Sequence, residues 1–427
     1  MRQALAVMLL VWVWVEVRAM PLLPLGPADT PQYVVEEAIS PGVTHYRVQR
    51  GRTGLNAASA PTGTPAESGP WVLHLVTIDP ALSRGRLALL LPDVADAPRQ
   101  PTSALQRAAS SVVTINGGFF VERDADGFPG QAAGLSLSAG RVNSAPINGR
   151  PVLELRGGAI SIWPQIDWTA ELIWSNGQRM PVDGINRKVG LVRNCGRDID
   201  DPPQHDHTCR YADDLVYFPP DSRYKLAEHD AARFAIGPAG LVRELRIDER
   251  PSAADALLVS SASSSRTSLM RQYVAELLRA AFSVHSRTVR TDDGASFWIN
   301  GGPTLLLRGH AVREETREGW GLTAADGPQR ARVLFDWVHR PHPRTAVGVR
   351  PDGVILLLVA DGRRPGVSAG LTIEELRRVM AALGAEDALN LDGGGSTTMV
   401  IGGRVVNQPS DATGERRVGD AIGLVLE

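Results

Sequence analysis

Apolar residues along this chain alternate or cluster over short stretches, and few stretches repeat them at helical spacing. Residues 71–78 alternate as a strand does, residues 111–115 form a β-branched apolar run, and residues 215–218 form another short run. Residues 265–282 show an amphipathic helical pattern. Its expected apolar side carries Leu269, Val274, Leu277 and Leu278. The pattern predicts an α+β fold with a mixed β-sheet core and few helices.

The C-terminal part predicts a strand, a helix and a second strand. Residues 354–360 form a continuous apolar run, typical of a buried strand, that ends at Asp361. Residues 372–375, Thr-Ile-Glu-Glu, fit a capping box at the start of a helix. Residues 388–391 form a second short strand that ends at Asp392. This order predicts a crossover connection between two strands that run parallel.

Glycine pairs mark several tight turns. Residues 398–401 and 404–406 predict a hairpin around Gly402-Gly403. The string Ile-Asn-Gly-Gly occurs twice, beginning at Ile115 and at Ile299. Both copies follow predicted strands, so we expect two strands that end in turns where glycine supplies a positive φ.

The N-terminus has the pattern of an export signal. Arg2 precedes an apolar run over residues 4–15, and Ala19 offers a small residue before a cleavage point. We expect a signal peptide over residues 1–19 and an extracytoplasmic mature protein, periplasmic or secreted. The run is too short to span a bilayer comfortably, so we expect no stable membrane insertion after cleavage. The alternative is an uncleaved membrane anchor.

Residues 20–70 are rich in Pro, Gly, Ala, Ser and Thr and predict a flexible N-terminal segment. Within it, residues 43–48 could form a first strand, and residues 51–70 have the composition of a linker or mobile loop. The ordered body is expected to begin near Trp71 and to form one domain over residues 71–427.

Charge and cysteine content narrow the function classes. The 427-residue chain has a formal net charge of -2, so no basic surface indicates nucleic acid as a partner. Cys195 and Cys209 are the only cysteines. In an exported protein such a pair predicts a disulfide. His205 and His207 lie between them, so a zinc site is the alternative, although neither cysteine belongs to a C-x-x-C pair.

Two carboxylates are candidates for catalysis. Asp361 and Asp392 each follow a predicted strand directly. Parallel strands joined by a helix end at the same edge of a sheet, where ligands bind. Strands that are neighbours or one apart would bring the carboxylates to within roughly 5–10 Å of each other. Paired carboxylates at such separations cleave glycosidic bonds, or bind a metal. The alternative is that each Asp only forms a turn beside glycine.

A glycine-rich loop follows the second carboxylate. Gly393, Gly394 and Gly395 would let backbone N–H groups approach a phosphate or sugar oxygen, and the hydroxyls of Ser396 and Thr397 add donors. No lysine follows, so the segment is not a Walker motif. A tight, bulged turn is the structural alternative.

Other polar residues are candidates for binding. The planar guanidinium of Arg344 suits a phosphate or a carboxylate, with a surface charge or a buried ion pair as the alternative. Asn407, Ser410 and Asp411 form a polar cluster after the hairpin, where turn formation is the alternative. Residues 119–120, Phe-Phe, could stack on a sugar, although core packing is the commoner role of phenylalanine.

Taken together, these segments resemble the phosphodiester glycosidase domain family. The resemblance is carried by NLDGGGSTTMV at residues 390–400, with TINGGFF at 114–120, RTAVG at 344–348, ADGR at 360–363 and NQPSD at 407–411 in the same order. It covers the chain from about Trp71 onwards and is strongest after Arg344.

The resemblance implies hydrolysis of a sugar-1-phosphodiester to a free sugar and a phosphomonoester. It implies Asp392 or Asp361 as general acid or nucleophile and Arg344 as the residue that holds the phosphodiester. The implied substrate-binding residues are Asn116, Gly117, Gly393, Gly394, Ser396, Thr397, Asn407, Ser410 and Asp411. No cofactor is clearly required, and calcium would suit the hard oxygen ligands near these Asp residues. The alternative function is a non-catalytic glycan-binding protein in exopolysaccharide or cell-wall assembly.

Overall fold

The computed structural model describes residues 20–51, 69–92, 98–147, 149–195, 204–220, 222, 224, 231–291, 294–313, 317–321 and 328–426. The expected signal peptide, residues 1–19, and most of the expected linker, residues 51–70, lie outside these ranges. Within them, no helix combines the length and apolar character needed to cross a membrane. The described chain is rich in strands and has four α-helices, which confirms the expected β-rich fold with few helices.

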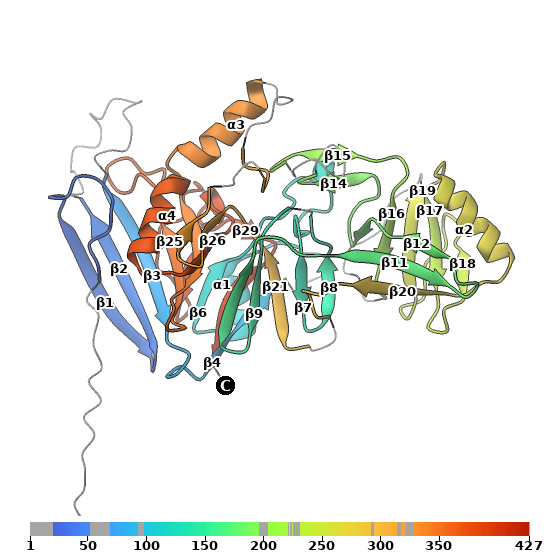
Figure 1. Cartoon of the computed structure of the whole chain (residues 1–427), viewed down its shortest axis with the longest axis horizontal. Helices are drawn as coiled ribbons and strands as arrows, with labels where there is room; N and C mark the ends of the chain where they lie inside the picture. Colours follow the sequence, from blue (N-terminus) through green and yellow to red (C-terminus); the bar gives the residue numbers. More distant parts are fainter. Residues whose placement is uncertain are drawn as a thin grey trace, which may run out of the picture.

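An eight-stranded sheet forms one end of the elongated molecule (Figure 1). Its strands, in spatial order, are β1 (Gln32–Ser40), β2 (Val43–Arg50), β3 (Trp71–Ile78), β25 (Ile355–Ala360), β24 (Arg344–Val349), β26 (Asp387–Asn390), β22 (Thr304–Leu307) and β23 (His310–Ala311). All neighbouring pairs are antiparallel. Because alternate residues on the central strands are buried on opposite faces, this sheet needs a cover on both sides.

The ordered body begins earlier than the sequence predicts. Residues 32–50 form a hairpin that pairs with β3, whereas the sequence predicts a flexible segment over residues 20–70. Val43 and Val48 are buried, so this hairpin belongs to the core of the sheet. The first strand expected over residues 43–48 is confirmed as part of β2, whereas the Pro- and Gly-rich composition of the surrounding residues hides β1.

Strands β25 and β26 are not hydrogen-bonded neighbours, because β24 lies between them and pairs with both. Each is antiparallel to β24, so β25 and β26 end at the same edge of the sheet. Helix α4 (Ile373–Ala382) connects them and begins with a capping box formed by Thr372 and Glu375. It buries its apolar side on one face of the sheet.

A second sheet covers the other face of the main sheet. Its order is β28 (Arg404–Val405), β27 (Met399–Ile401), β6 (Val113–Asn116), β30 (Ala421–Leu426) and β4 (Gly85–Leu90), and the hairpin predicted around Gly402-Gly403 is confirmed as β27 and β28. Side chains from both sheets share one apolar core. A further sheet consists of β10 (Ala159–Trp163), β9 (Val152–Arg156), β21 (Ser296–Asn300), β7 (Ser136–Ser138) and β8 (Arg141–Ser144).

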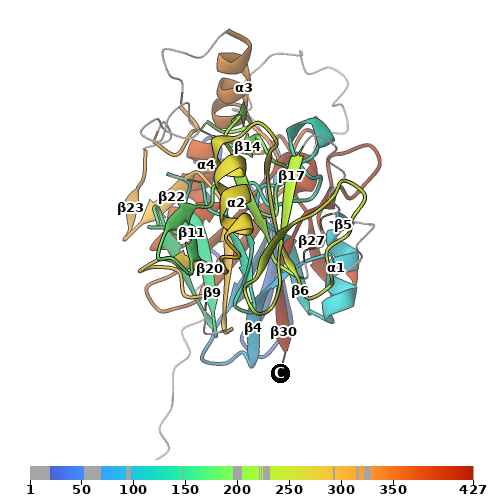
Figure 2. The same cartoon turned by 90° about the vertical axis from the view of Figure 1, so that its right-hand side faces the viewer.

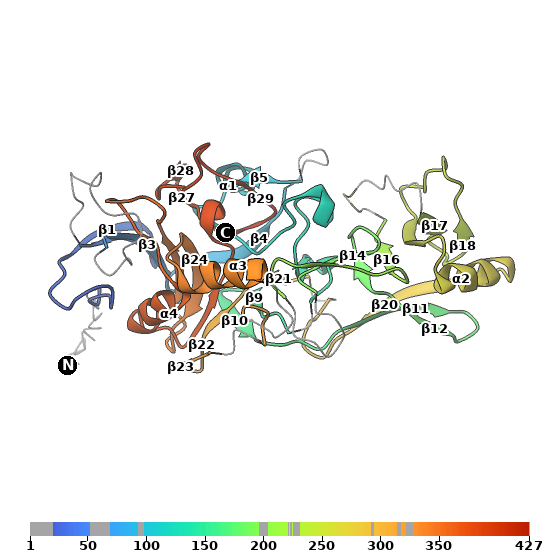
Figure 3. The same ribbon diagram turned by 90° about the horizontal axis from the view of Figure 1, so that it is seen from above.

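An outer lobe lies at the opposite end of the molecule from β1 (Figures 1 and 3). Its strands are β11 (Thr169–Trp174), β12 (Arg179–Pro181), β13 (Gly184–Ile185), β16 (Leu215–Phe218), β17 (Ala231–Ile236), β18 (Val242–Glu244), β19 (Ala256–Ser261) and β20 (Ala280–His285). The lobe has apolar clusters of its own. The single domain expected over residues 71–427 thus includes a lobe with a separate core.

Helix α2 (Ser265–Ala275) in this lobe is shorter than the helix predicted over residues 265–282, because the chain turns at Leu277, where φ is 56°. Residues 280–285 then pair with β11 as a strand. The predicted apolar side is confirmed only in part: Val274 and Leu278 pack against the apolar cluster of the lobe, whereas Leu269 and Leu277 are exposed. The helix instead buries Thr267, Met270 and Tyr273.

Candidate functional site

A cavity of about 200 Å³ lies at the edge of the main sheet where β26 ends. It is lined by Phe119, Phe120, Glu122, Ala133, Arg193, Asn194, His205, Asp206, Val333, Trp337 and Asp392. These residues come from the turn after β6, from the segment around the disulfide, from α3 (Pro328–His339) and from the end of β26. Figure 2 shows α3 at the upper edge of the molecule, with β14 (Leu191–Arg193) just below it.

Asp392 is the predicted catalytic residue that reaches this cavity. Its Oδ1 accepts a hydrogen bond from the backbone N–H of Gly393 at 2.8 Å, and its carbonyl accepts one from Asn116 Nδ2 at 2.7 Å. Burial raises the pKa of Asp392 to about 7, against the lowering effects of the Ser396 hydroxyl and the positive charge of Arg416. The carboxyl group therefore carries a proton for part of the time near neutral pH.

The glycine-rich loop makes room for two arginines. Gly394 has a φ of 61°, and a Cβ added to it would lie 3.0 Å from Arg363 Nη2. A Cβ on Gly395 would collide with Arg416 Nη2 and with the carboxylate of Asp411. Glycine is therefore needed here because guanidinium groups lie directly on the backbone, a reason that the sequence does not reveal.

Arg416 joins two carboxylates across this loop. It donates from Nε to Asp411 Oδ2 at 2.8 Å and from Nη1 to Glu122 Oε1 at 2.8 Å. Glu122 lines the cavity together with Asp392, and its negative charge contributes to the raised pKa of Asp392. Glu122 is absent from the residues that the sequence predicts for the site. Its only signal there is its position directly after the Gly-Gly-Phe-Phe-Val segment.

Asn116 is completely buried and holds three segments together. Its Oδ1 accepts hydrogen bonds from Thr345 Oγ1 at 2.7 Å and from the Thr398 N–H at 3.1 Å. Its Nδ2 donates a hydrogen bond to the backbone carbonyl of Asp392. Asn116 does not line the cavity, so its contacts position Asp392 and the strand that follows it. Thr397 is also buried, 3.5 Å from the Thr345 hydroxyl.

Asp361 lies against the loop that follows the β27–β28 hairpin, and it does not line the cavity. Its Oδ1 accepts hydrogen bonds from Asn407 Nδ2 at 3.1 Å and from the Gln408 N–H at 2.9 Å. Burial raises the pKa of Asp361 to about 6, although these two hydrogen bonds act in the opposite direction. Asn407 also accepts a hydrogen bond from the Met399 N–H at 2.7 Å. Asp361 and Asn407 together therefore tie this loop to the ends of β25 and β27.

Arg344 is completely buried and directed at backbone carbonyls. It donates from Nε to Leu371 O at 2.8 Å and from Nη2 to Trp337 O and Arg340 O at the end of α3. Its guanidinium carbon lies 4.7 Å from the centre of the Trp337 ring. Burial lowers the pKa of Arg344 to about 9. The contacts fasten α3 and its tryptophan to the main sheet.

Three further residues that the sequence predicts for binding are Gly117, Ser396 and Ser410. A Cβ on Gly117 would collide with Asp420 Oδ1, which also accepts a hydrogen bond from the Gly118 N–H at 2.8 Å. The hydroxyl oxygens of Ser396 and Ser410 are buried and have no hydrogen bond of ordinary geometry among the described residues.

Aromatic rings form one wall of the cavity. Phe119 and Trp337 line it, with ring centres 6.2 Å apart, and His205 stacks on Trp320 at 3.8 Å. The guanidinium carbon of Arg150 lies 4.5 Å from the centre of the Trp320 ring. Phe119 and Phe120 are buried and still contribute to the lining, so core packing and cavity formation coincide at these residues.

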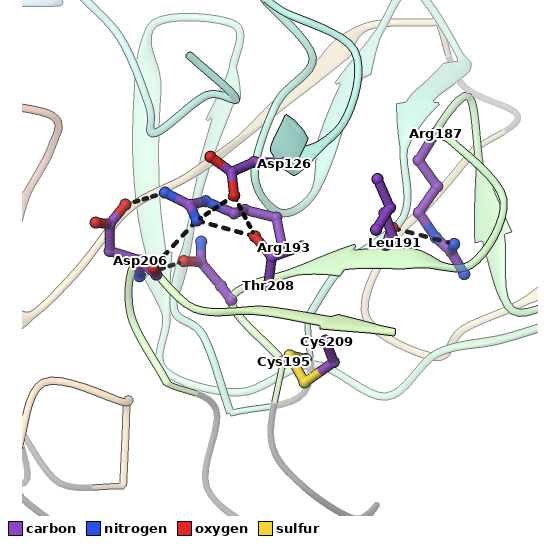
Figure 4. Close-up of a disulfide and its surroundings, with 9 residues drawn as sticks. Asp126, Arg187, Leu191, Arg193, Cys195, Asp206, Thr208 and Cys209 are labelled. Atoms are coloured by element: carbon purple, nitrogen blue, oxygen red, sulfur yellow. Dashed lines mark hydrogen bonds and ion pairs between the residues drawn. A yellow bond between two sulfur atoms is a disulfide. The ribbon is translucent and has the colours of Figure 1, made fainter. Parts of the chain in front are cut away.

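The predicted disulfide between Cys195 and Cys209 is present (Figure 4). It braces strands β14 and β15 (Thr208–Arg210), whose segment brings Arg193, His205 and Asp206 to the cavity. Among the described residues, Cys195, His207 and Cys209 are the one group of three metal-ligand side chains, with ligand atoms within 4.8 Å of one another. Because the two sulfurs are bonded, this group favours the disulfide over zinc. Within the part of the chain that the structure describes, neither Asp361 nor Asp392 belongs to such a group.

Known proteins resemble this chain in sequence. The phosphodiester glycosidase family matches residues 252–425. N-acetylglucosamine-1-phosphodiester alpha-N-acetylglucosaminidase of Mus musculus is 40% identical over 86 residues, which are 20% of this chain and 16% of that protein. The SPbeta prophage-derived uncharacterized protein YomE of Bacillus subtilis is 33% identical over 99 residues, 23% of this chain and 15% of that protein. The matched regions thus span under a fifth of the length of these relatives.

Solved structures share the fold over nearly the whole chain. A protein of Burkholderia pseudomallei described as exported is 25% identical, with a TM-score of 0.80, over 95% of this chain and 99% of that chain. A hypothetical protein of Synechocystis is 19% identical, with a TM-score of 0.65, over 94% of this chain and 65% of that chain. The match to the phosphodiester glycosidase family lies in the C-terminal part of this chain, which contributes Arg344, Asp361 and Asp392.

Proposed function

We propose that this protein hydrolyses the glycosidic bond of a sugar-1-phosphodiester, or of a related surface glycan, outside the cytoplasm. One observation carries the proposal: a carboxyl group whose pKa is raised to about 7, that of Asp392, lines a cavity with aromatic rings and a second carboxylate. The substrate class follows from the family and from the name of the mammalian relative. An extracytoplasmic location agrees with the disulfide and with the exported structural neighbour.

Asp392 is the proposed general acid. Near neutral pH a substantial fraction of this side chain is protonated, as an acid that works at that pH requires. Its proton would pass to the oxygen that joins the sugar C1 to phosphorus. The C1–O bond then breaks, its electron pair stays with the phosphate, and water supplies the hydroxyl group at C1. The products are a free sugar and a phosphomonoester.

A second carboxylate is needed to activate the water or to attack C1. The sequence predicts Asp361 for this role, whereas Glu122 shares the cavity with Asp392. Arg416 donates a hydrogen bond of 2.8 Å to Glu122 and so holds this carboxylate in place at the cavity. We therefore assign the base to Glu122 and propose that Asp361 positions the loop of Asn407 and Gln408.

The aromatic wall supports a sugar ligand. The rings of Phe119 and Trp337 give the cavity an apolar surface beside the polar groups of Asn194 and Asp206. Sugars combine apolar C–H faces with hydroxyl groups, so a site with both kinds of surface suits them. The same wall would also serve a protein that binds glycans without cleaving them, which is the second candidate function.

Hydrolysis of a panel of sugar-1-phosphodiesters tests the proposal. The secreted or periplasmic form is incubated with each compound, and the free reducing sugar is measured against boiled protein. Release of sugar from one or more compounds supports the enzyme. No release by a folded protein, together with measurable affinity for the same glycans, would support the binding protein instead.

A further inference from the structure

We propose that Arg363 is the residue that binds the phosphate group of the substrate, in the role that the sequence predicts for Arg344. This inference rests on the proposed function and deepens it, because a phosphate-binding residue distinguishes a phosphodiester from an uncharged glycoside. It follows from the environments of the arginines near the glycine-rich loop.

Arg344 has no exposed surface to offer a substrate. Two of its nitrogens donate to backbone carbonyls of Leu371, Trp337 and Arg340. The third, Nη1, is buried and without a hydrogen bond among the described residues. A substrate phosphate could reach this guanidinium only if the end of α3 moved away, so Arg344 acts on the wall of the cavity and not on the ligand.

Other arginines near the site already pair with carboxylates. Arg416 contacts Asp411 and Glu122, each at 2.8 Å. Arg193 contacts Asp126 at 3.5 Å and also pairs with Asp206. Their charges are largely compensated within the protein, and a phosphate would have to displace a carboxylate to bind them in full.

Arg363 is exposed and forms no ion pair with a carboxylate in the part of the chain that the structure describes. Its Nε and Nη2 each lie 3.2 Å from His342 Nδ1. A neutral imidazole nitrogen can accept a hydrogen bond without cancelling the charge of the guanidinium. The group therefore keeps a net positive charge, with donors left for a ligand.

The backbone directs Arg363 onto the catalytic loop. Its φ of 57° is left-handed, a conformation that few residues other than glycine adopt. It follows a tight turn, in which a Cβ on Gly362 would lie 2.6 Å from the Pro343 nitrogen. With this geometry Nη2 lies over Gly394, two residues after Asp392. The buried hydroxyls of Ser396 and Ser410 belong to the same glycine loop and to the loop facing it.

This placement suits the charge that develops during the reaction. A phosphodiester carries one negative charge, and the phosphate receives the electron pair of the C1–O bond as that bond breaks. A guanidinium beside it strengthens its hydrogen bonds as this charge grows, and can contact two phosphate oxygens at once. Arg363 would thus stabilise the departing phosphomonoester while Asp392 supplies the proton.

The test compares Arg363→Gly and Arg363→Gln with the control Arg364→Gln. Glycine adopts the left-handed backbone without strain, so Arg363→Gly removes the guanidinium from a protein that still folds. Arg364 is the exposed neighbour, which donates to Pro409 O at 2.8 Å. Two quantities are measured on each protein: kcat/KM for the best sugar-1-phosphodiester, and the dissociation constant of inorganic phosphate by calorimetry.

We expect both Arg363 variants to lower kcat/KM by roughly 10- to 100-fold and to weaken phosphate binding similarly, as expected for a lost charged hydrogen bond. Arg364→Gln should stay within about threefold of the wild type, the range of a surface change away from the ligand. Phosphate binding needs no turnover, so Arg363-dependent binding by a protein that cleaves no compound would sustain this site while rejecting the proposed function. Wild-type affinity in both Arg363 variants, or no phosphate binding by the wild type, would overturn the assignment.

Discussion

The guanidinium carbon of Arg344 lies 4.7 Å from the centre of the Trp337 ring, and the same guanidinium donates a hydrogen bond to the Trp337 carbonyl. Trp337 lines the cavity from α3, while Arg344 is the first residue of β24. One side chain therefore fastens the aromatic wall of the cavity to the sheet whose edge carries Asp392.

Replacing Arg344 should destabilise the protein before it affects ligand contacts. The Arg344→Gln variant leaves the carbonyls of Leu371 and Trp337 without their donors, and a lost hydrogen bond to a buried charged group costs about 1.5–3 kcal/mol. Urea unfolding should show that loss in the free energy of unfolding. An unchanged unfolding curve with strongly weakened phosphate binding would return Arg344 to the role that the sequence predicts.

The raised pKa of Asp392 predicts a definite pH dependence. The protonated acid disappears as pH rises through about 7, so kcat/KM should fall on the alkaline side with that midpoint. In the unfolded chain the group titrates near 3.8, so between about 3.8 and 7 the folded state binds more protons than the unfolded state. The free energy of unfolding should therefore decrease as pH rises across this window and level off above it.

The Asp392→Asn variant provides the control, since it cannot titrate at this position. Its stability should decrease less between pH 4 and 7 than that of the wild type, and the remaining slope should come partly from Asp361, whose pKa is raised to about 6. Equal slopes for the two proteins would show that the folded-state pKa of Asp392 is not raised.

Replacing Glu122 should lower activity, whereas replacing Asp361 should mainly lower stability. Glu122→Gln keeps the size of the side chain but removes the proposed base, so we expect kcat to fall by about 10²- to 10⁴-fold with little change in Tm. Asp361→Asn weakens the two hydrogen bonds to Asn407 and Gln408, so its main effect should be a lower Tm. Glu244→Gln is the matched control, because this glutamate pairs with Arg271 at 2.8 Å in the outer lobe. The reverse pattern, with a catalytic loss only in Asp361→Asn, would make Asp361 the second carboxylate.

Gly395→Ala should disrupt the site through a single methyl group. The added carbon would collide with Arg416 Nη2 and with Asp411, so the arginine that holds Glu122 must move. We expect a loss of activity and a destabilisation of about 1–3 kcal/mol, as for other overpacked positions. Gly237→Ala is the control, since the nearest atoms to its new carbon lie at 3.8 Å. If the two variants had the same activity and the same thermal unfolding, the predicted collision of a Cβ at Gly395 with Arg416 and Asp411 would be wrong.

Local patterns in the sequence were sufficient for several elements. The alternation over Trp71–Ile78 and the capping box of Thr372 and Glu375 depend on neighbouring residues alone, and both are confirmed. The disulfide was also predictable, because the chain has only two cysteines. Asp392 was singled out because it combines a strand end with a glycine run, and it lines the cavity as an edge residue should.

What the sequence could not reveal depends on contacts between distant segments. The position of β24 between β25 and β26 is a property of the whole sheet. Glu122 lies 294 residues from its partner Arg416, and no local motif marks it as part of the site. The sequence predicts Arg344 as a phosphate ligand from its residue type and from the family resemblance, although the direction of its side chain is set by the end of α3.

Turnover of a sugar-1-phosphodiester by the wild type and by Asp392→Asn tests the central claim most directly. Each protein is incubated at pH 6 with the best compound of the panel, and free sugar is measured, with circular dichroism and thermal unfolding to verify the fold. The proposal predicts sugar release by the wild type and a loss of at least about 100-fold in a folded Asp392→Asn variant. A near-normal rate in that variant would remove Asp392 from the mechanism and contradict the account.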